Sequence, residues 1–177
     1  PLNQLQLQDR IFNSVLPLLK SKQKTIAIIG GGDAAFDYAL NLAGKNKVHI
    51  LNRSGKPRML PILLSRCYQH HNIIIHENSR LTSAMTKKGT AEIILETLDP
   101  LGGQKNEIVC HLILTAIGRV PALHFLDTAL RAAITELQLQ KKIYLAGDVG
   151  NGRFRQASIA AADGLRAAME IHAGEIK

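Results

Sequence analysis

The run TIAIIGGGDAAFDYAL, residues 25–40, constrains the fold of this chain more than any other segment. An apolar stretch, residues 26–29, leads into three glycines, and good helix formers follow. Gly30, Gly32 and Ala35 stand at the G-x-G-x-x-A positions of a strand–turn–helix unit that binds dinucleotides. Gly30 permits the sharp turn, Gly32 lets a pyrophosphate approach the backbone, and Ala35 lets helix and strand pack closely. The alternative is a glycine turn with a purely structural role.

A second apolar run, residues 47–52, predicts a buried strand ending at Asn52 and indicates which nucleotide is bound. Enzymes selective for NAD place an acid at such a strand end, where it binds the ribose hydroxyls. This strand ends without an acid, and Arg53 and Arg58 follow. Because guanidinium groups form charge-assisted hydrogen bonds to phosphate, the loop 52–58 predicts a site for the 2′-phosphate of NADPH. The alternative is an ordinary solvated basic loop.

The composition argues against several classes of protein. The net charge is +8, but the basic residues are scattered and not interleaved with aromatics, so we expect no nucleic-acid partner. No apolar run approaches the roughly 18 residues of a membrane span, so we expect no membrane partner. Cys67 and Cys110 form no C-x-x-C pair and no metal-ligand spacing, so we expect buried structural thiols, no bound metal and a reducing, cytoplasmic setting.

The periodicity of the chain predicts a parallel sheet with helical crossovers, into which an antiparallel β-meander is inserted. The parallel strands and their crossover helices are expected at 25–29, 33–44, 48–52, 58–71 and 72–77. The strand-like runs of the meander are expected at 80–86, 91–98 and 107–115. A helical stretch over 122–133, a buried strand ending at Gly147-Asp148 and a long helix over 154–172 are expected to follow.

Four stretches, in this order and spacing, resemble the second half of a thioredoxin-reductase-like flavoprotein, one of the oxidoreductases with two dinucleotide-binding domains. They are GGGDAAFDYA (30–39), NRSGKPR (52–58), LILTAIGRVP (112–121) and the run 145–171. The resemblance implies NADP(H) and FAD as cofactors. The first stretch adds Gly31, Asp33 and Ala34 to the predicted nucleotide contacts, and the third adds backbone contacts from Ile117 and Gly118.

The fourth stretch implies a FAD site. In the family, the Asp of a Gly-Asp pair after a strand binds a ribityl hydroxyl, and the next helix aims its N-terminus at the pyrimidine edge of the flavin. The matching residues are Gly147, Asp148, Arg155, Gln156 and Ala157. A helix N-terminus stabilises an anion, which reduced flavin is at that edge. The alternative is a surface turn with an N-capping acid.

The resemblance also sets the expected fold class and domains. The class is α/β: a Rossmann-like three-layer β/β/α domain with a parallel sheet and an inserted antiparallel meander, plus a partial FAD-domain strand and helix. The expected segments are an N-terminal linker with an amphipathic stretch (1–24), an NAD(P)-binding domain (25–121) and a closing FAD-domain segment (122–177).

Three departures from the family pattern affect the functional prediction. The family's redox-active C-x-x-C matches the stretch 13–16, which has no cysteine, so a dithiol relay lacks its chemistry. The His and second Arg of the family's phosphate loop are replaced by Asn52 and Ser54, which weakens the preference for NADPH. The N-terminal FAD fingerprint has no counterpart, so a missing FAD-binding half is an expected partner.

The predicted function is therefore that of the NAD(P)H-binding portion of a flavin-dependent oxidoreductase. It passes hydride from NADPH to FAD and on to an acceptor other than an in-chain disulfide, either a small molecule or a redox protein such as ferredoxin. Hydride transfer needs no protein acid or base, so no catalytic residue is assigned. The alternative is a non-enzymatic NADP-binding module or subunit. Unpaired strand edges in the FAD-domain segment would be covered either by a second copy of the chain, which makes a homodimer a further expectation, or by residues 1–24.

Overall fold

The computed structural model describes residues 5–55, 58–87, 90, 92–99, 103–152 and 154–175. The chain divides into two compact units, 1–118 and 119–177, and each is described by itself. This division lies close to the expected boundary after residue 121, and the functional assignment of each segment stays a prediction.

Unit 1 is built on a five-stranded sheet in the order β1-β8-β2-β3-β4. Its strands are β1 (Ile11–Phe12), β2 (Thr25–Ile29), β3 (Lys47–Leu51), β4 (Ile73–His76) and β8 (Leu112–Thr115). All neighbours are parallel, which confirms for β2, β3 and β4 the prediction made from the helix-length crossovers; β1 and β8 were not predicted in this sheet. The register places Ile29 beside both Leu51 and Thr115, so β2, β3 and β8 end at one edge of the sheet.

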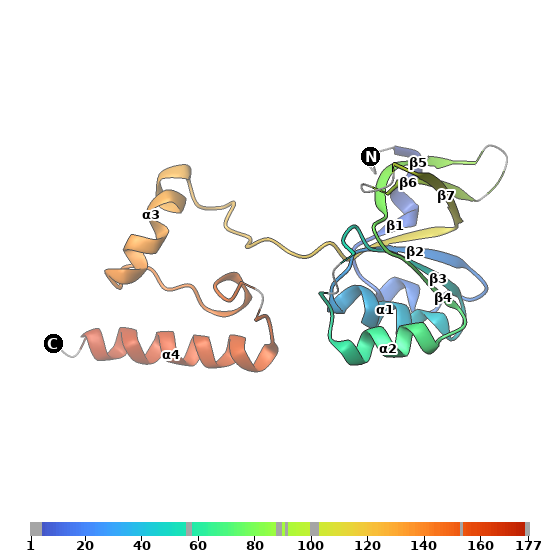
Figure 1. Ribbon diagram of the computed structural model, residues 1–177. Coiled ribbons are helices and arrows are strands. Elements are labelled where there is room, and N and C mark those ends of the chain that lie inside the picture. The colour runs from blue at the N-terminus through green and yellow to red at the C-terminus, as the bar shows by residue number, and fades with distance from the viewer. Residues whose placement is uncertain are drawn as a thin grey trace. The chain divides into compact units, whose positions relative to one another are not determined.

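Two helices cover one face of this sheet, α1 (Asp33–Ala43) and α2 (Pro61–Gln69) (Figure 1). The side chains of a strand alternate between its two faces, so Ile26 and Ile28 of β2 point to the same side. They pack with Phe36 of α1 and Ile50 of β3 in one buried apolar cluster. Each such side chain removed from water contributes about 1.5–3 kcal/mol to stability.

A three-stranded antiparallel sheet covers the opposite face (Figure 1). Its strands are β5 (Arg80–Thr86), β6 (Ile93–Leu98) and β7 (Lys105–Cys110). Ala27 of β2 and Ile113 of β8 point to this side and are buried with Ile93, Leu95 and Cys110. The predicted three-layer β/β/α arrangement with an inserted meander is confirmed.

The run 107–115 forms two strands in two different sheets, which the prediction of one continuous run missed. The chain leaves β7 at Cys110 and enters β8 at Leu112. His111 lies between them, where its N–H donates to the carbonyl of Thr25 at 2.8 Å and its Nδ1 accepts from the Thr25 N–H at 3.0 Å. This reciprocal pair fixes the crossing of the chain from the meander to the parallel sheet.

Residues 5–24 contribute to the packing of unit 1. They form η1 (Leu5–Arg10), β1 and η2 (Leu16–Leu18), and the fully buried side chain of Leu7 reaches the meander side of the core. Leu18 is buried on the helix side. The Thr115 hydroxyl donates to the Phe12 carbonyl at 3.1 Å, beside the β1–β8 pairing. The amphipathic stretch therefore packs on the sheet as its first edge strand.

Unit 2 contains α3 (Thr128–Leu139), η3 (Gly147–Val149) and α4 (Ala157–Glu175). The helix expected over 122–133 starts later, because the Asp127 carboxylate caps it by accepting from the Leu130 N–H at 2.7 Å. The strand expected to end at Gly147-Asp148 does not form. A strand needs a neighbour for its backbone hydrogen bonds, and the described part of unit 2 offers none. Among the described residues, no helix combines the length and apolar character that a membrane crossing requires.

Candidate functional site

Three of the predicted nucleotide-binding stretches meet where the parallel strands end. Gly30 follows β2, Asn52 follows β3 and Ala116 follows β8. The Gly30 N–H donates to the Leu51 carbonyl at 3.1 Å, and the Ala116 N–H donates to the Ile29 carbonyl at 2.8 Å. In open α/β sheets, ligands bind in the crevice at the carboxyl ends of the strands. The predicted residues are therefore gathered at the edge where such a ligand would lie.

The three glycines of the turn have different surroundings. A β-carbon on Gly30, whose φ is +156°, would overlap the carbonyl oxygen of Ala116. A β-carbon on Gly31 would overlap the side chain of Asn52. A β-carbon on Gly32 would meet nothing within 4 Å. The first two glycines let the loops close on one another, whereas the third leaves open space at the start of α1.

That open space lies at the N-terminus of α1. Gly32 is its N-cap and contributes no side-chain hydrogen bond to the first turn. Free N–H groups and the positive end of the helix dipole favour a phosphate at such a position. Asp33 and Ala34 are exposed beside it. The Asp33 carboxylate accepts from the Leu60 N–H at 2.7 Å, so this side chain also fixes the residue that precedes α2.

The loop after β3 is held by Asn52 and presents two arginines. Asn52 is only 6% exposed, and its Oδ1 accepts from the Ser54 N–H at 3.1 Å. A parallel bridge joins the backbone of Arg58 to that of Gly32. The side chains of Arg53 and Arg58 are exposed. Asn52 thus shapes the loop, and the arginines are the groups in it that can reach a phosphate; residues 56 and 57 lie outside the described residues.

The stretch after β8 ends unit 1 with an exposed turn. Gly118 has a φ of +96°, a left-handed conformation that favours glycine. The Ile117 side chain before it is 76% exposed. A large apolar side chain and an accessible backbone at a strand end suit the predicted contact with a bound nucleotide.

The predicted FAD residues gather within unit 2, at η3 and the start of α4. Gly147 has a φ of +78°, and a β-carbon there would lie 3.5 Å from the Cβ of Ala160. The Asn151 amide donates to the Gly147 carbonyl at 2.8 Å and also to the Asp163 carboxylate. These bonds hold the turn against α4. The Asp148 carboxylate remains exposed on η3.

Arg155 lies just before α4 and contacts the segment that begins unit 2. Its Nη1 donates to the Arg119 carbonyl at 2.8 Å. Its Nε is buried and has no hydrogen-bond partner among the described residues. Gln156 and Ala157 follow at the exposed start of α4. A buried hydrogen-bond donor without a partner lowers the stability of the fold by about 1–3 kcal/mol, so an acceptor bound at this nitrogen would be stabilising.

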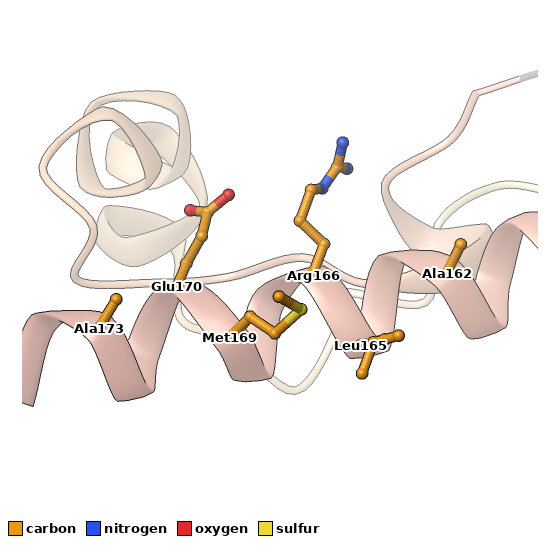
Figure 2. A pocket seen from close by; sticks show the side chains of 6 residues that line it. All are labelled: Ala162, Leu165, Arg166, Met169, Glu170 and Ala173. Carbon is orange, nitrogen blue, oxygen red and sulfur yellow. The ribbon is translucent and has the colours of Figure 1, made fainter.

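An apolar hollow runs along α4, away from these residues (Figure 2). Ala162, Leu165, Arg166, Met169, Glu170 and Ala173 line it. Leu165 is 65% exposed and Met169 is 63% exposed. In the described part of unit 2, residues are exposed or partly buried, and none is fully buried. The unit therefore lacks a core of its own and presents apolar surface.

The two cysteines are buried in separate layers, Cys67 in α2 and Cys110 in β7, as expected for structural thiols. Burial raises the pKa of Cys67 to about 11 and that of Cys110 to about 12. The Cys67 thiol donates to the Phe36 carbonyl at 3.6 Å. Neither thiol is placed to form the reactive thiolate of a disulfide relay.

A histidine pair on the meander side of the sheet was missed by the sequence reasoning. Nδ1 of His49 lies 2.8 Å from Nε2 of His76, across the β3–β4 pairing. The pKa of His49 is lowered to about 4, mainly by burial and further by the charges of His76 and Lys47. Burial also lowers the pKa of His76. The alternation of β3 puts His49 on the same face as Leu51, but its pairing with His76 depends on the register of β3 against β4.

Comparisons with known proteins identify the family of the chain. The family model for pyridine nucleotide-disulphide oxidoreductases matches residues 3–164. The thioredoxin reductase of Yarrowia lipolytica is 28% identical over 175 residues, which cover 90% of this chain and 52% of the relative. That of Treponema pallidum is 28% identical over 155 residues, covering 83% of this chain and 50% of the relative.

Solved structures show the same fold. The thioredoxin reductase of Lactococcus lactis in its FR conformation superposes with a TM-score of 0.76 at 23% identity, covering 92% of this chain and 57% of that one. The T. acidophilum enzyme gives a TM-score of 0.78 at 18% identity, covering 99% of this chain and 61% of that one. The chain spans about half the length of the first two curated relatives. From the match over residues 3–164, it belongs to the pyridine nucleotide-disulphide oxidoreductase family.

Proposed function

We propose that this chain is the NADPH-binding portion of a flavin-dependent oxidoreductase. The observation that carries the proposal is the glycine turn, in which Gly30 and Gly31 are closed against other loops while Gly32 is open at the N-terminus of α1. At this position the open space adjoins the free N–H groups of a helix N-terminus, where a phosphate is favoured. The family assignment and a relative described as an NADPH-dependent thioredoxin reductase support the same function.

The nucleotide would be bound by groups at the carboxyl edge of the sheet. The N–H groups at the start of α1 would bind the pyrophosphate, which can approach because Gly32 has no side chain. Arg53 and Arg58 would bind the 2′-phosphate with charge-assisted hydrogen bonds. The backbone at Ile117 and Gly118 would contact the nucleotide from the end of β8.

The residues of unit 2 fit a FAD molecule in two respects. Asp148 offers an exposed carboxylate on a glycine turn, which suits a ribityl hydroxyl, and Arg155 has a buried Nε that lacks an acceptor. Bound FAD would supply the chemistry that accepts a hydride. The chain's own groups would orient it: Asp148 would accept a hydrogen bond, and the start of α4 would stabilise negative charge near Gln156 and Ala157.

The electron acceptor would lie outside this chain. The stretch 13–16, where the family carries its dithiol, has no cysteine, and Cys67 and Cys110 are buried in separate layers. We therefore propose a small oxidant or a redox protein as the acceptor. The two free, buried thiols are consistent with the cytoplasm as the compartment.

A further polypeptide segment would complete unit 2. None of its described residues is fully buried, and Val120, Phe125 and Leu165 are largely exposed. We propose that a FAD-binding half covers this apolar surface, whether it is joined to this chain or supplied by another. A homodimer would cover further surface in the same way.

The test is the visible absorption spectrum of the chain, alone and mixed with the N-terminal half of the Treponema pallidum relative. With that half present, we expect a flavin band near ~450 nm that NADPH bleaches. NADPH binding without a flavin band in either sample would favour the non-enzymatic NADP-binding module. Absence of NADPH binding in both samples would overturn the proposed function.

A further inference from the structure

The backbone that carries Arg58 is held against the glycine turn and the start of α1. A parallel bridge joins Arg58 to Gly32, the N-cap of α1. The next residue, Met59, is 8% exposed and packs in the buried cluster on the helix side of the sheet. Leu60 follows, and its N–H donates to Oδ1 of Asp33 at 2.7 Å. All three consecutive residues are therefore attached to the part of the fold that carries the glycine turn.

The hydrogen bond between Leu60 and Asp33 is a strong one for a surface contact. An N–H that donates to a carboxylate forms a charge-assisted bond, roughly twice as strong as a bond between neutral groups. Its length lies at the short end of the range for N–H donors. The bond joins the first residue of α1 to the N-cap residue of α2. It therefore fixes the end of the arginine loop from the side of the helix that would bind the pyrophosphate.

The charge of Asp33 argues against a direct role in binding phosphate. An acid in the first turn of a helix is stabilised by the helix dipole, but it repels a phosphate bound at the same place. The carboxylate of Asp33 is engaged by the Leu60 N–H on the side of the loop. Shaping the loop is therefore a role that this side chain can perform without a contact to the nucleotide.

We propose that Asp33 is a positioning residue for Arg58 and thereby sets the preference for NADP⁺ over NAD⁺. This inference rests on the proposed function, in which Arg58 binds the 2′-phosphate. A guanidinium binds a phosphate through an oriented pair of N–H donors, so a fixed backbone lowers the entropic cost of the contact. By holding Leu60, Asp33 keeps Arg58 beside the N-terminus of α1, where one dinucleotide can reach both.

The charge of Asp33 and its hydrogen bond have opposite effects on this preference. NADP⁺ carries one phosphate more than NAD⁺, so removal of a nearby negative charge favours NADP⁺. Removal of the hydrogen-bond acceptor releases the backbone at Leu60 and disfavours NADP⁺, because the 2′-phosphate loses an oriented Arg58. A loss of NADP⁺ preference in a variant without the charge therefore reports on the hydrogen bond.

The experiment measures NADP⁺ and NAD⁺ affinities of the full chain by calorimetry and compares their ratio between variants. Asp33→Ala removes the charge and the acceptor, whereas Asp33→Asn removes the charge and keeps an oxygen that can accept from Leu60. Asp37→Ala is the matched control, because it removes the same charge one turn further along α1, where the carboxylate accepts from the Asn41 amide at 3.2 Å. Arg58→Ala, alone and combined with Asp33→Ala, completes a double-mutant cycle.

A second variant breaks the same bond from the donor side. Leu60→Pro deletes the N–H, and the φ of −59° at this residue suits proline. The side chain lost is 57% exposed. Leu60→Pro should therefore lower the NADP⁺ preference as Asp33→Ala does, and it keeps the test decisive if Asp33→Ala fails to fold. Urea unfolding midpoints verify that each variant is folded.

We expect Asp33→Ala to lower the NADP⁺ preference about fivefold or more, and Asp33→Asn and Asp37→Ala to lower it about twofold or less. In the Arg58→Ala background, Asp33→Ala should lower it no further. An unchanged preference in folded Asp33→Ala or Leu60→Pro would overturn the proposal. So would an equal loss in Asp33→Asn, or the full loss in the Arg58→Ala background.

Arg58→Ala separates this inference from the function on which it rests. If Arg58→Ala leaves the preference unchanged, the proposed contact with the 2′-phosphate fails and the role of Asp33 fails with it. If Arg58→Ala lowers the preference and Asp33→Ala does not, the phosphate contact stands and only the positioning role of Asp33 is overturned.

Discussion

The side chain of Asn52 occupies the space that a β-carbon on Gly31 would need. Asn52 is held there by its hydrogen bond from the Ser54 N–H, and the Asn52 N–H donates to the His76 carbonyl at 2.9 Å. The end of β3 and the glycine turn after β2 are thus fitted to each other. The fold therefore needs a glycine at position 31, whereas Gly32 faces open space.

Replacing Gly31 with alanine should therefore destabilise the protein. The added methyl must displace a buried side chain, and overpacking of this kind costs about 1–3 kcal/mol. Urea unfolding followed by circular dichroism measures the change, with Gly32→Ala as the matched control. Equal stability of the two variants would mean that Asn52 moves aside freely.

Replacing Gly32 with valine should abolish NADPH binding and leave the fold intact. The N-cap has φ −108° and ψ 179°, an extended conformation that valine adopts readily, and the space around it is open. The larger side chain would fill the place of the pyrophosphate. Calorimetric titration with NADP⁺ and the urea midpoint give the two readouts. If Gly32→Val binds NADP⁺ as tightly as the unmodified protein, the glycine turn has only a structural role.

Replacing Arg53 and Arg58 with alanine should weaken NADP⁺ binding much more than NAD⁺ binding. Hydrogen bonds to charged groups contribute about 1.5–3 kcal/mol, so the loss of each arginine should weaken NADP⁺ binding roughly tenfold to 150-fold and leave NAD⁺ binding nearly unchanged. Arg66→Ala, an exposed arginine in the last turn of α2, is the control. Equal losses of affinity for NADP⁺ and NAD⁺ would mean that the arginines attract both nucleotides by their charge and do not bind the 2′-phosphate.

Stability should fall as the pH drops through the range in which His49 titrates. The folded-state pKa of His49 is about 4, below its ordinary value of 6.5, so the unfolded chain binds the proton first. The stability that neutral His49 contributes is present above pH 6.5 and is lost as the pH falls toward 4. Urea midpoints of the protein and of His49→Gln, measured across this window, should diverge in slope. Parallel slopes would show that the titrating carboxylates account for all of the loss.

Both cysteines should resist thiol reagents in the native state. Their raised pKa values leave little thiolate at neutral pH, and both side chains are buried. Reaction with 5,5′-dithiobis(2-nitrobenzoate) should be slow in buffer and complete in denaturant. Rapid labelling of Cys67 or Cys110 in buffer would contradict this prediction and would mean that a thiol of this chain can take part in electron transfer.

Strands β2, β3 and β4 of the parallel sheet could be predicted because their information is local. They are apolar runs separated by helix-length segments, which is typical of parallel strands joined by right-handed crossovers. The places of β1 and β8 in the sheet depend on distant pairing and were not predicted. The roles of Gly30 and Gly32 follow from the spacing of the motif. The contact between Gly31 and Asn52 could not be predicted, because it depends on how two strand ends sit in register.

Two of the differences depend on non-local pairing between strands. The run before Gly147 has strand character, but strand formation depends on neighbours that unit 2 does not provide. The His49–His76 pair depends on the register of β3 against β4, which periodicity alone does not set. The helix at 122–133 was misplaced for a local reason, since Asp127 is a stronger start signal than the apolar residues before it. The assignments of Asp148 and Arg155 to FAD stay predictions.

Because the three glycines have different surroundings, a library of random variants can separate selection for folding from selection for nucleotide binding. Substitutions at Gly30 and Gly31 would be depleted by any screen that demands a folded, abundant protein, because both positions are closed by other loops. Substitutions at Gly32 would survive that screen and disappear only when growth requires the bound nucleotide. Depletion of substitutions at Gly30 and Gly31 would then measure the requirement for folding, and depletion at Gly32 would measure the requirement for nucleotide binding.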